Sequence, residues 1–464
     1  MSDTLVVLSR VQFGLTIAFH YIYPPLSIGL GVMLVAFEAL YLKTGDPLWR
    51  QVARFWTRVF ALTFAIGVAT GLVMEFEFGT NWANYSRFVG DVFGSALAAE
   101  GIFAFFLESG FLALLLFGWD VLPPRVHFFS TLMVSLGAHF SAIWIVVANS
   151  WMQTPAGYHI VPGPSGPRAE ITDFWALVFN PSSMPRLTHV VLGAWLAGAF
   201  LVMSVAAWYL VHQRHQRFAL ASVRVAALVA LVSSLLQVVM GHQSVLYVAR
   251  YQPTKFAAME AHYATGPAPL TMAGWVDEGA EQVRGVRIPG GGSFLLGADT
   301  ALSVPGLNEV APGDRPPVQA TFQSFHVMVA IGFALLAIAA VAGLLAWRQT
   351  LERHRAVLWV LVVAVLGPQV ANQAGWMTAE IGRQPWIVQG LMRTSAGISP
   401  IVTPGQVIFS LVLFTLIYVL LFVVFIYLLN DKIQHGPDAI EDRGSLLALP
   451  ARLVDVLRQP RTEL

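Results

Sequence analysis

The amino-acid sequence predicts an all-α integral membrane protein that forms a single membrane domain over residues 1–464. Of the 464 residues, 56% are hydrophobic and only 11% are charged, and the mean hydropathy is +0.66. A water-soluble domain of this size does not carry so few charges. In addition, apolar runs long enough to cross a membrane, about 20 residues each, recur about nine times along the chain.

These runs are expected to form transmembrane helices. Their approximate bounds are 14–38, 55–78, 93–117, 128–150, 188–211, 219–245, 322–347, 356–380 and 406–430. Arg and Lys gather in the connections after the first, third, fifth and seventh runs and in the tail after the ninth. By the positive-inside rule these segments face the cytoplasm, so the N-terminus is expected outside and the C-terminus inside. The acidic start MSDTLVVLSR is unlike a signal peptide, so the first run is expected to be retained.

The longest connection, 246–321, falls on the expected outer side. It is rich in Gly and Pro, as in GPAPLTMAGW and RIPGGGSF, and it shows no helical period after its first two turns. Connections of this length are usually functional or disordered. The connection is therefore a candidate functional region.

Net charge and cysteine content exclude several function classes. The formal net charge is +1, and no stretch interleaves Lys or Arg with aromatic residues, so no nucleic acid is expected as a partner. The chain contains no Cys, which excludes a disulfide, a thiolate zinc site, an iron–sulfur cluster and covalently attached haem. Any metal must be held by His, Met, Glu or Asp.

Ionisable side chains lie within or at the ends of the predicted spans. They are His20, Glu100, Glu108, His189 and Glu380. A charged side chain at mid-bilayer costs roughly 2.5–3.5 kcal/mol on insertion scales, so such residues are functional candidates. His20 lies beside two Tyr and before a Pro pair that loosens the helix, and a role as ligand or proton relay is favoured over packing. His189 taken singly is equally typical of a hydrogen-bonded residue at the membrane interface.

Two further patterns leave alternatives open. Glu100 and Glu108 are eight residues apart, which on a regular α-helix gives about 12 Å of rise and about 80° of rotation. They can line one face as a proton path, the alternative being two carboxyls bonded separately to neighbouring helices. Met328 alone is more typical of packing. Together, His, Met and Glu on separate helices fit axial haem ligation better than a zinc or copper cluster.

Five stretches, in order and nearly end to end, resemble subunit I of the cytochrome bd family of quinol oxidases. They are LSRVQFGLTIAFHYIYPPL, GVATGLVMEFEFGTNWANYSRFVGDVFGSALAAEGIFAFFLES, SAIWIVVANSWMQTP, TKFAAMEA and AEIGRQPW. The connection lacks the long insertion of some relatives, so the chain is most similar to the short-loop branch that includes the cyanide-insensitive oxidases. The resemblance implies helical bundles that enclose haems. It also implies quinol oxidation at the periplasmic side and reduction of O2 to water with cytoplasmic protons, which generates a proton-motive force without pumping.

The resemblance further implies ligands for haem iron. His20 and Glu380 match the axial ligands of two high-spin haems, namely haem b and either haem d or a further haem b in its place. Which of these two haems each residue takes stays open. His189 and Met328 match the two axial ligands of low-spin haem b, a pairing that raises the potential relative to bis-His ligation.

Other matched positions surround the cofactors. Arg383 is expected to neutralise negative charge such as that of haem propionates, and Trp376 and Arg10 are expected to contact haem. Glu100 matches the glutamate beside the oxygen-reducing haem, where it is also a candidate iron ligand. Glu108 matches the next member of a proton route.

Lys255 and Glu260, in the long connection, match residues implicated in quinol oxidation. An acid and a base near the quinol hydroxyls suit the release of protons, whereas the simplest alternative is a solvated ion pair worth at most about 1 kcal/mol. One position departs from the family: many relatives carry Arg where this chain has His326. Because positions two apart on a helix point about 200° apart, His326 cannot ligate the same iron as Met328, and its weaker positive charge is expected to alter the low-spin potential.

The resemblance also implies partners and a location. Subunit II, a small single-helix subunit, quinol, O2 and membrane lipid are the expected partners, and a bacterial cytoplasmic membrane is the expected location. Two other functions compete. One is a proton-coupled transporter in which the same residues form a relay without metal. The other is a purely electron-transferring cytochrome b subunit, whose usual pair of His on one helix is missing from this sequence.

Overall fold

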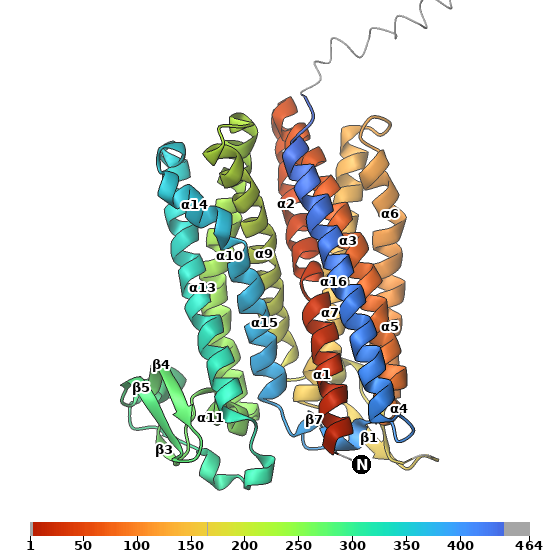
Figure 1. Ribbon diagram of the computed structural model, residues 1–464, viewed down its shortest axis with the longest axis vertical. Coiled ribbons are helices and arrows are strands. Elements are labelled where there is room, and N and C mark those ends of the chain that lie inside the picture. Colours follow the sequence, from red (N-terminus) through yellow and green to blue (C-terminus); the bar gives the residue numbers. More distant parts are fainter. Residues whose placement is uncertain (1–2, 165, 440–464) are drawn as a thin grey trace, which may run out of the picture.

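The described part of the chain contains nine helical segments long and apolar enough to cross a membrane, and they run side by side (Figure 1). The computed structural model describes residues 3–164 and 166–439. The crossing segments are Asp3–Thr44, Pro47–Thr80, Gly90–Phe117, Pro124–Gln153, Ser183–Val211, Gln216–Tyr251, Val318–Trp347, Arg355–Ile381 and Pro404–His435. The predicted fold class and the expected number of crossings are confirmed. Each helical segment extends beyond the apolar run that predicted it.

The first crossing is interrupted directly after His20. Helix α1 (Asp3–His20) ends there, and α2 (Tyr23–Thr44) begins three residues later. The Pro pair that follows Tyr23 lies in the first turn of α2, where the missing N–H would have no helical partner in any case. His20 therefore occupies the C-terminal end of a helix inside the bundle.

The third crossing is not a regular α-helix. Helices α5 (Gly90–Glu100) and α6 (Phe106–Phe117) are joined by a π-helical turn, η1 (Gly101–Phe105). Hydrogen bonds of the i→i+5 type replace the usual ladder in such a turn, and such turns are frequent at functional sites. The rise and rotation expected between Glu100 and Glu108 for a regular α-helix are therefore wrong in detail.

The remaining crossings include α9, which packs against several other helices of the bundle. They are α3 (Pro47–Thr80), α7 (Pro124–Gln153), α9 (Ser183–Val211), α10 (Gln216–Tyr251), α13 (Val318–Trp347), the consecutive α14 (Arg355–Ala364) and α15 (Leu366–Ile381), and α16 (Pro404–His435). Helix α9 packs against α2, α7, α10, α14 and α15. Where α9 meets α2, a Cβ on Gly29 would lie 2.3 Å from the carbonyl oxygen of Ala194. Glycine is needed there because it lets the two backbones approach closely.

Short elements cap the end of the bundle that holds the N-terminus (Figure 1). Four two-stranded antiparallel sheets pair β1 (Tyr158–Val161) with β2 (Arg168–Ile171), β3 (Gly266–Pro267) with β6 (Ser303–Val304), β4 (Leu270–Asp277) with β5 (Gln282–Ile288), and β7 (Trp386–Val388) with β8 (Met392–Arg393). The short helices are α4 (Ala83–Phe88), α8 (Phe174–Val178), α11 (Pro253–Met259) and α12 (Gly291–Gly297), with 3₁₀ turns η2 (Leu307–Glu309), η3 (Pro312–Asp314), η4 (Leu351–Arg353) and η5 (Thr394–Gly397). Of these, η4 lies in the α13–α14 connection and not at this end.

The long connection is shorter and more structured than the sequence suggested. Helix α10 continues to Tyr251 and α13 begins at Val318, so the connection spans 252–317 rather than 246–321. Helices α11 and α12 and strands β3 to β6 lie within it. In Figure 1 this segment forms a lobe beside the N-terminal end of the bundle, in contact with α13.

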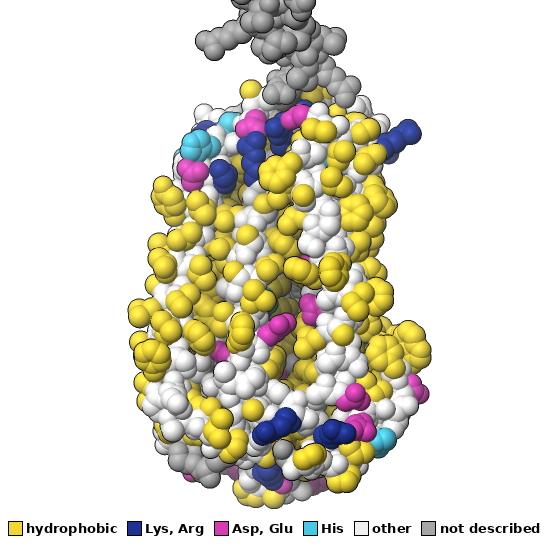
Figure 2. All heavy atoms as spheres, turned by 90° about the vertical axis from the view of Figure 1, so that its right-hand side faces the viewer, with side chains coloured by type: hydrophobic (Ala, Val, Ile, Leu, Met, Phe, Trp, Pro, Cys, Tyr) yellow, Lys and Arg dark blue, Asp and Glu magenta, His cyan; other side chains and the backbone are white. Residues whose placement is uncertain are grey.

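The surface separates into bands. Figure 2 shows a broad hydrophobic band between two ends at which charged side chains gather, with a few acidic side chains in the middle of the band. At the end opposite the N-terminus, Arg50, Arg54 and Arg58 follow one face of α3 and form ion pairs with Asp120 and Asp438. The apolar band is where lipid tails would contact the protein.

Candidate functional site

Glu380 and Arg383 form a partly buried ion pair at the C-terminal end of α15. Arg383 Nη2 donates to Glu380 Oε2 over 2.5 Å, and the Arg383 side chain is only 4% exposed. The other carboxylate oxygen, Oε1, accepts from Asn149 Nδ2 and Gln153 Nε2, both at 3.2 Å. Arg186 Nη2 on α9 lies 3.9 Å from the same oxygen. Two arginines therefore balance the charge that a carboxylate brings into the bundle.

Aromatic rings surround this charged group. The Arg186 guanidinium lies 5.7 Å from the centre of the Trp376 ring. The Tyr21 ring meets the same Trp edge-on at 5.3 Å. A cation over an aromatic face is stabilised by the ring quadrupole. Trp376 is thus connected to Glu380 through Arg186, and its expected contact with haem stays a prediction.

Lys255, on α11, connects to the same group. Its Nζ donates to Gln153 Oε1 and, over 3.0 Å, to Gln252 Oε1, and the residue is 5% exposed. Because Gln153 also donates to Glu380, one amide side chain links Lys255 to the carboxylate. Burial, reinforced by the nearby Arg186 and Arg383 and opposed by Glu380, holds the pKa of Lys255 well below its ordinary value. A lowered pKa favours the neutral amine, which is the form that can accept a proton.

Glu260 lies apart from Lys255, at the end of α11. It is 5% exposed, and its Oε2 accepts from the backbone N–H of Thr271 at 3.4 Å. Burial raises the pKa of Glu260 to about 7, and the Thr271 N–H and Arg287 limit the rise. No salt bridge joins Lys255 to Glu260 within the described residues, and both are buried. They are therefore not a solvated ion pair.

His20 contacts helix α3. Its Nδ1 lies 2.9 Å from Thr70 Oγ1, and a Cβ on Gly71 would lie 3.2 Å from His20 Cε1. Thr70 in turn donates to the carbonyls of Ile66 and Gly67, so its hydroxyl oxygen is oriented to accept from the ring. A ring nitrogen fixed by one hydrogen bond leaves the other set for a ligand.

His189 and Met328 lie on α9 and α13, each against a glycine. Gln237 Nε2 lies 3.2 Å from His189 Nε2, whereas His189 Nδ1 is buried with no hydrogen-bond partner in the part of the chain described. A Cβ on Gly241 would lie 3.6 Å from His189 Cε1, and one on Gly375 would lie 2.9 Å from the Met328 sulfur. An unpaired imidazole nitrogen is costly in an apolar interior. His and Met are a donor pair that haem iron accepts, and the glycine beside each of them adds no side chain next to the donor.

His326 is directed at backbone and not at the position of Met328. Its Nδ1 lies 2.8 Å from the carbonyl of Phe322, and its Nε2 lies 2.9 Å from the carbonyl of Thr271 on β4. Each ring nitrogen thus lies near a backbone carbonyl, to one of which a neutral ring donates, and this placement agrees with the helical argument that His326 and Met328 point apart.

Glu100 and Glu108 both face α7 across the π turn. Glu100 Oε1 accepts from Ser141 Oγ at 2.5 Å. The Glu108 side chain is 7% exposed and packs on Gly137, where an added Cβ would lie 2.4 Å from Glu108 Cγ. The two carboxyls therefore line one helix interface although the helix between them is irregular.

Arg10 is the one predicted site residue that lies outside these contacts. It is exposed on α1, ten residues and about 15 Å of helix before His20. Conversely, the sequence reasoning passed over Asn149, Gln153 and Arg186, which surround Glu380. The first two lie in the stretch SAIWIVVANSWMQTP, and two amides near the end of an apolar run were the available signal.

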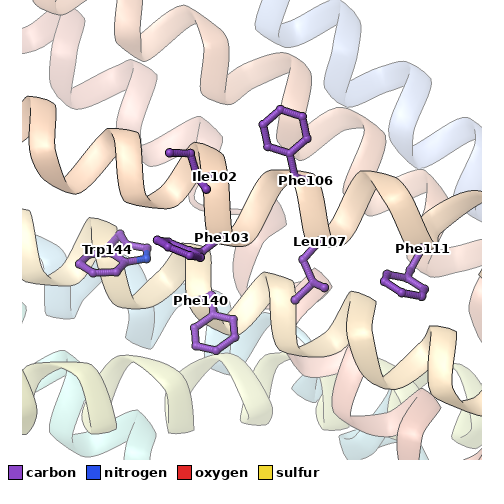
Figure 3. A pocket seen from close by; sticks show the side chains of 7 residues that line it. All are labelled: Ile102, Phe103, Phe106, Leu107, Phe111, Phe140 and Trp144. Carbon is purple, nitrogen blue, oxygen red and sulfur yellow. The ribbon is translucent and has the colours of Figure 1, made fainter.

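A separate surface groove of about 540 Å³ lies between the π turn, α6 and α7 (Figure 3). Its lining is almost wholly apolar and includes Phe103, Phe106, Phe140 and Trp144. It contains none of the predicted site residues. Its composition is that of a surface facing lipid tails.

The fold and the site define a multi-pass helical membrane protein in which His20, His189 and Met328 lie on three separate helices and Glu380, on a fourth, pairs with two arginines. Residues 8–437 match the family described as cytochrome bd terminal oxidase subunit I. The chain belongs to this family, which confirms the resemblance seen in the sequence and makes it part of a terminal quinol oxidase. The proton-coupled transporter is accordingly not favoured.

Individual relatives match along almost their whole length. The chain is 39% identical to cytochrome bd ubiquinol oxidase subunit 1 of Bacillus subtilis, over 93% of this chain and 94% of that protein. It is 34% identical to cytochrome bd-II ubiquinol oxidase subunit 1 of Escherichia coli, over 94% and 98%. Among solved structures, the bd oxidase of Geobacillus thermodenitrificans superposes with a TM-score of 0.86 at 32% identity, over 93% of this chain and 99% of that one.

Proposed function

We propose that this chain oxidises quinol at the end of the bundle that carries the long connection, and that it passes the electrons to haems held by His20, His189, Met328 and Glu380. The observation that supports this most directly is the continuous polar link from Lys255 through Gln153 to Glu380. It joins a residue of the connection to a candidate haem ligand. The region expected at 246–321, whose connection spans 252–317 in the structure, is then the quinol-binding part of a single membrane domain.

Two residues accept protons from the quinol, one from each hydroxyl. Lys255, with its lowered pKa, accepts a proton from one quinol hydroxyl, and Glu260 accepts from the other when it is ionised. Both are buried, so the protons do not exchange freely with water at the moment of transfer. Oxidation of quinol requires the loss of protons with the electrons, which is why two acceptors of moderate basicity suit the task.

The haem assignments rest on the donors that the fold presents. His189 and Met328 would hold low-spin haem b, and His20 and Glu380 would hold two high-spin haems, one haem b and the other haem d or a further haem b. Glu100 is a further candidate ligand at the oxygen site. When bound, these groups would carry electrons from quinol to O2. Arg383, Trp376 and Arg10 would bind the cofactors, with Arg383 balancing negative charge.

Protons for oxygen reduction are drawn from the opposite side. Glu108 and Glu100 form a route along α7, with Ser141 holding the second carboxyl. The arginines of α3 at the end opposite the N-terminus support a cytoplasmic location for that end. The N-terminus is then periplasmic and the C-terminus cytoplasmic in a bacterial inner membrane. Because protons are released and consumed on opposite sides, the reaction is electrogenic without a pump.

Subunit II of the oxidase is the expected protein partner, with a small single-helix subunit in addition. Membrane lipid surrounds the apolar band, and quinol and O2 are the substrates. The connection between α10 and α13 lacks the long insertion of some relatives, which supports placement in the short-loop branch.

One experiment tests the proposal as a whole. The purified oxidase complex is reduced with quinol, its visible absorption spectrum is recorded, and pyridine-haemochrome analysis assigns the haems. Haem bands that become reduced together with oxygen uptake are expected. Haem bands without oxygen uptake would indicate the electron-transferring cytochrome b function, and no haem bands would contradict the proposal altogether.

A further inference from the structure

The first turns of α13 hold one edge of strand β4 through a ladder of three hydrogen bonds between side chains and backbone. Its rungs are Val276 N–H to Gln319 Oε1 at 2.9 Å, Gln323 Nε2 to the Gly274 carbonyl at 2.8 Å, and His326 Nε2 to the Thr271 carbonyl at 2.9 Å. The helix residues are spaced by four and three positions, so they lie on one face. The ladder therefore fixes how the long connection sits on the helix that carries Met328.

The ladder also stabilises the β4–β5 hairpin. Strand β4 pairs with β5 in a two-stranded sheet within the described residues. A two-stranded hairpin is marginally stable alone, and an unpaired strand edge exposes backbone N–H and C=O groups. Side chains of α13 satisfy those groups along the free edge of β4.

A β-bulge brings Thr271 into the ladder. Val276 and Gly274 are two residues apart, as expected for residues on one side of a strand. Thr271 lies three residues before Gly274, so a regular strand would turn it to the other side. The register shifts between Thr271 and Ala273, and such an extra residue re-aims the backbone beyond it. As a result the N–H and C=O of Thr271 both point away from β5. The C=O meets His326, and the N–H meets Glu260 Oε2 at 3.4 Å.

We propose that His326 is a positioning residue of the quinol-oxidation site, which holds Thr271 so that its N–H stays directed at the carboxylate of Glu260. This rests on the proposed role of Glu260 in quinol oxidation. The second ring nitrogen of His326 lies 2.8 Å from the Phe322 carbonyl. With the ring proton on Nε2, the ring donates to the Thr271 carbonyl, so turning the ring breaks that bond. Thr271 is 3% exposed and is held on both sides, which makes it a rigid connection between α13 and Glu260.

The alternative is that the ladder merely stabilises the lobe. Two variants of the complete oxidase complex separate these roles. His326→Leu removes the inner rung, and His326→Gln keeps an N–H donor at the end of a flexible side chain. Phe333→Leu, at an exposed position of the same helix, is the matched control.

The decisive measurement combines kinetics with hydrogen exchange. For His326→Leu, kcat/KM for quinol should fall about tenfold or more, while an artificial donor that reduces the haems directly still supports oxygen reduction. Exchange of the Thr271 amide hydrogen should quicken by about tenfold. His326→Gln should retain quinol kinetics within about threefold of the wild type. Equal quinol kinetics in His326→Leu and Phe333→Leu would overturn the proposal.

If His326→Leu also loses the low-spin haem spectrum, Gln323→Leu replaces it as the test variant. It breaks the middle rung, one turn further from Met328, and should raise the quinol KM about threefold with a normal spectrum. An unchanged KM there would likewise overturn the proposal. Failure of the proposed function is recognised separately, because the wild-type complex would then oxidise no quinol.

Discussion

Lys255 and Glu380 are joined by a single side chain, that of Gln153, whose carbonyl oxygen accepts from Lys255 Nζ and whose amide nitrogen donates to Glu380 Oε1. Gln153 is 1% exposed. A buried amide with partners at both ends has one orientation that satisfies every atom. We expect this arrangement to couple the protonation of Lys255 to the charge on the Glu380 carboxylate.

Gln153→Leu should therefore uncouple the two residues. Leu resembles Gln in size but has no polar atoms, so Lys255 loses one acceptor and Glu380 loses one donor while keeping Arg383, Arg186 and Asn149. We expect quinol-driven turnover to fall about tenfold to a hundredfold with haem content preserved. Gln252→Leu removes the other acceptor of Lys255 and one donor to Gln153 Oε1. It keeps the bonds from Lys255 to Gln153 and from Gln153 to Glu380, so it is the matched control. Equal turnover in the two variants would contradict the coupling.

Met328→Leu should remove or convert the low-spin haem signal and leave the high-spin signals. Leu is close to Met in volume but has no sulfur to coordinate iron. The absorption spectrum of the reduced complex is the measurement. Met203→Leu on α9, which is fully buried, controls for a general packing effect. An unchanged low-spin spectrum in Met328→Leu would mean that the ligand assignment is wrong.

The crossing helices could be predicted from the sequence, because a long apolar run is a local signal. A charge within such a run is also a local signal, so it marks candidate site residues, whose roles stay predictions. The positions of His20, His189 and Glu380 inside the bundle needed no knowledge of neighbours. Gln153 and Arg186 were missed because a neutral amide or an arginine near the end of a span is equally typical of the membrane interface. Their role depends on partners that lie far away in the sequence.

The backbone irregularities were also beyond the sequence. The π turn at Gly101–Phe105 lies in a run of apolar residues that is typical of continuous helix, and it packs on α7. The bulge near Thr271 lies where His326 of α13 contacts the Thr271 carbonyl. Local propensity does not specify either feature.

Glu108→Gln should slow oxygen reduction about tenfold or more while leaving haem incorporation nearly unchanged. The amide keeps the shape of the side chain against Gly137 but cannot take up and release a proton. Quinol-driven oxygen uptake and haem content of the same sample give the two quantities. Glu352→Gln, in the 3₁₀ turn between α13 and α14, is a control that lies outside the path. Near wild-type turnover in Glu108→Gln would rule out the route along α7.

The last prediction concerns the pH dependence of quinol oxidation. Burial raises the pKa of Glu260 to about 7. Below that pH the carboxyl is protonated and cannot accept a proton from quinol, whereas above it the carboxylate can. Quinol-driven turnover should therefore rise as the pH increases through about 7, which gives the pH profile a rising limb. Glu260→Gln should abolish this rising limb and most of the activity.

A second variant fixes the direction of the effect. The positive charge of Arg287 lowers the Glu260 pKa, so Arg287→Gln should move the rising limb to higher pH and leave the maximum rate within about twofold. An artificial donor that reduces the haems directly bypasses Glu260, and its oxidation should keep the wild-type pH profile in both variants. If Glu260→Gln lost activity equally with both donors, the loss would reflect misfolding. If instead Glu260→Gln kept the rising limb, another group would be the acceptor, and Glu260 would be excluded as the base that takes the quinol proton.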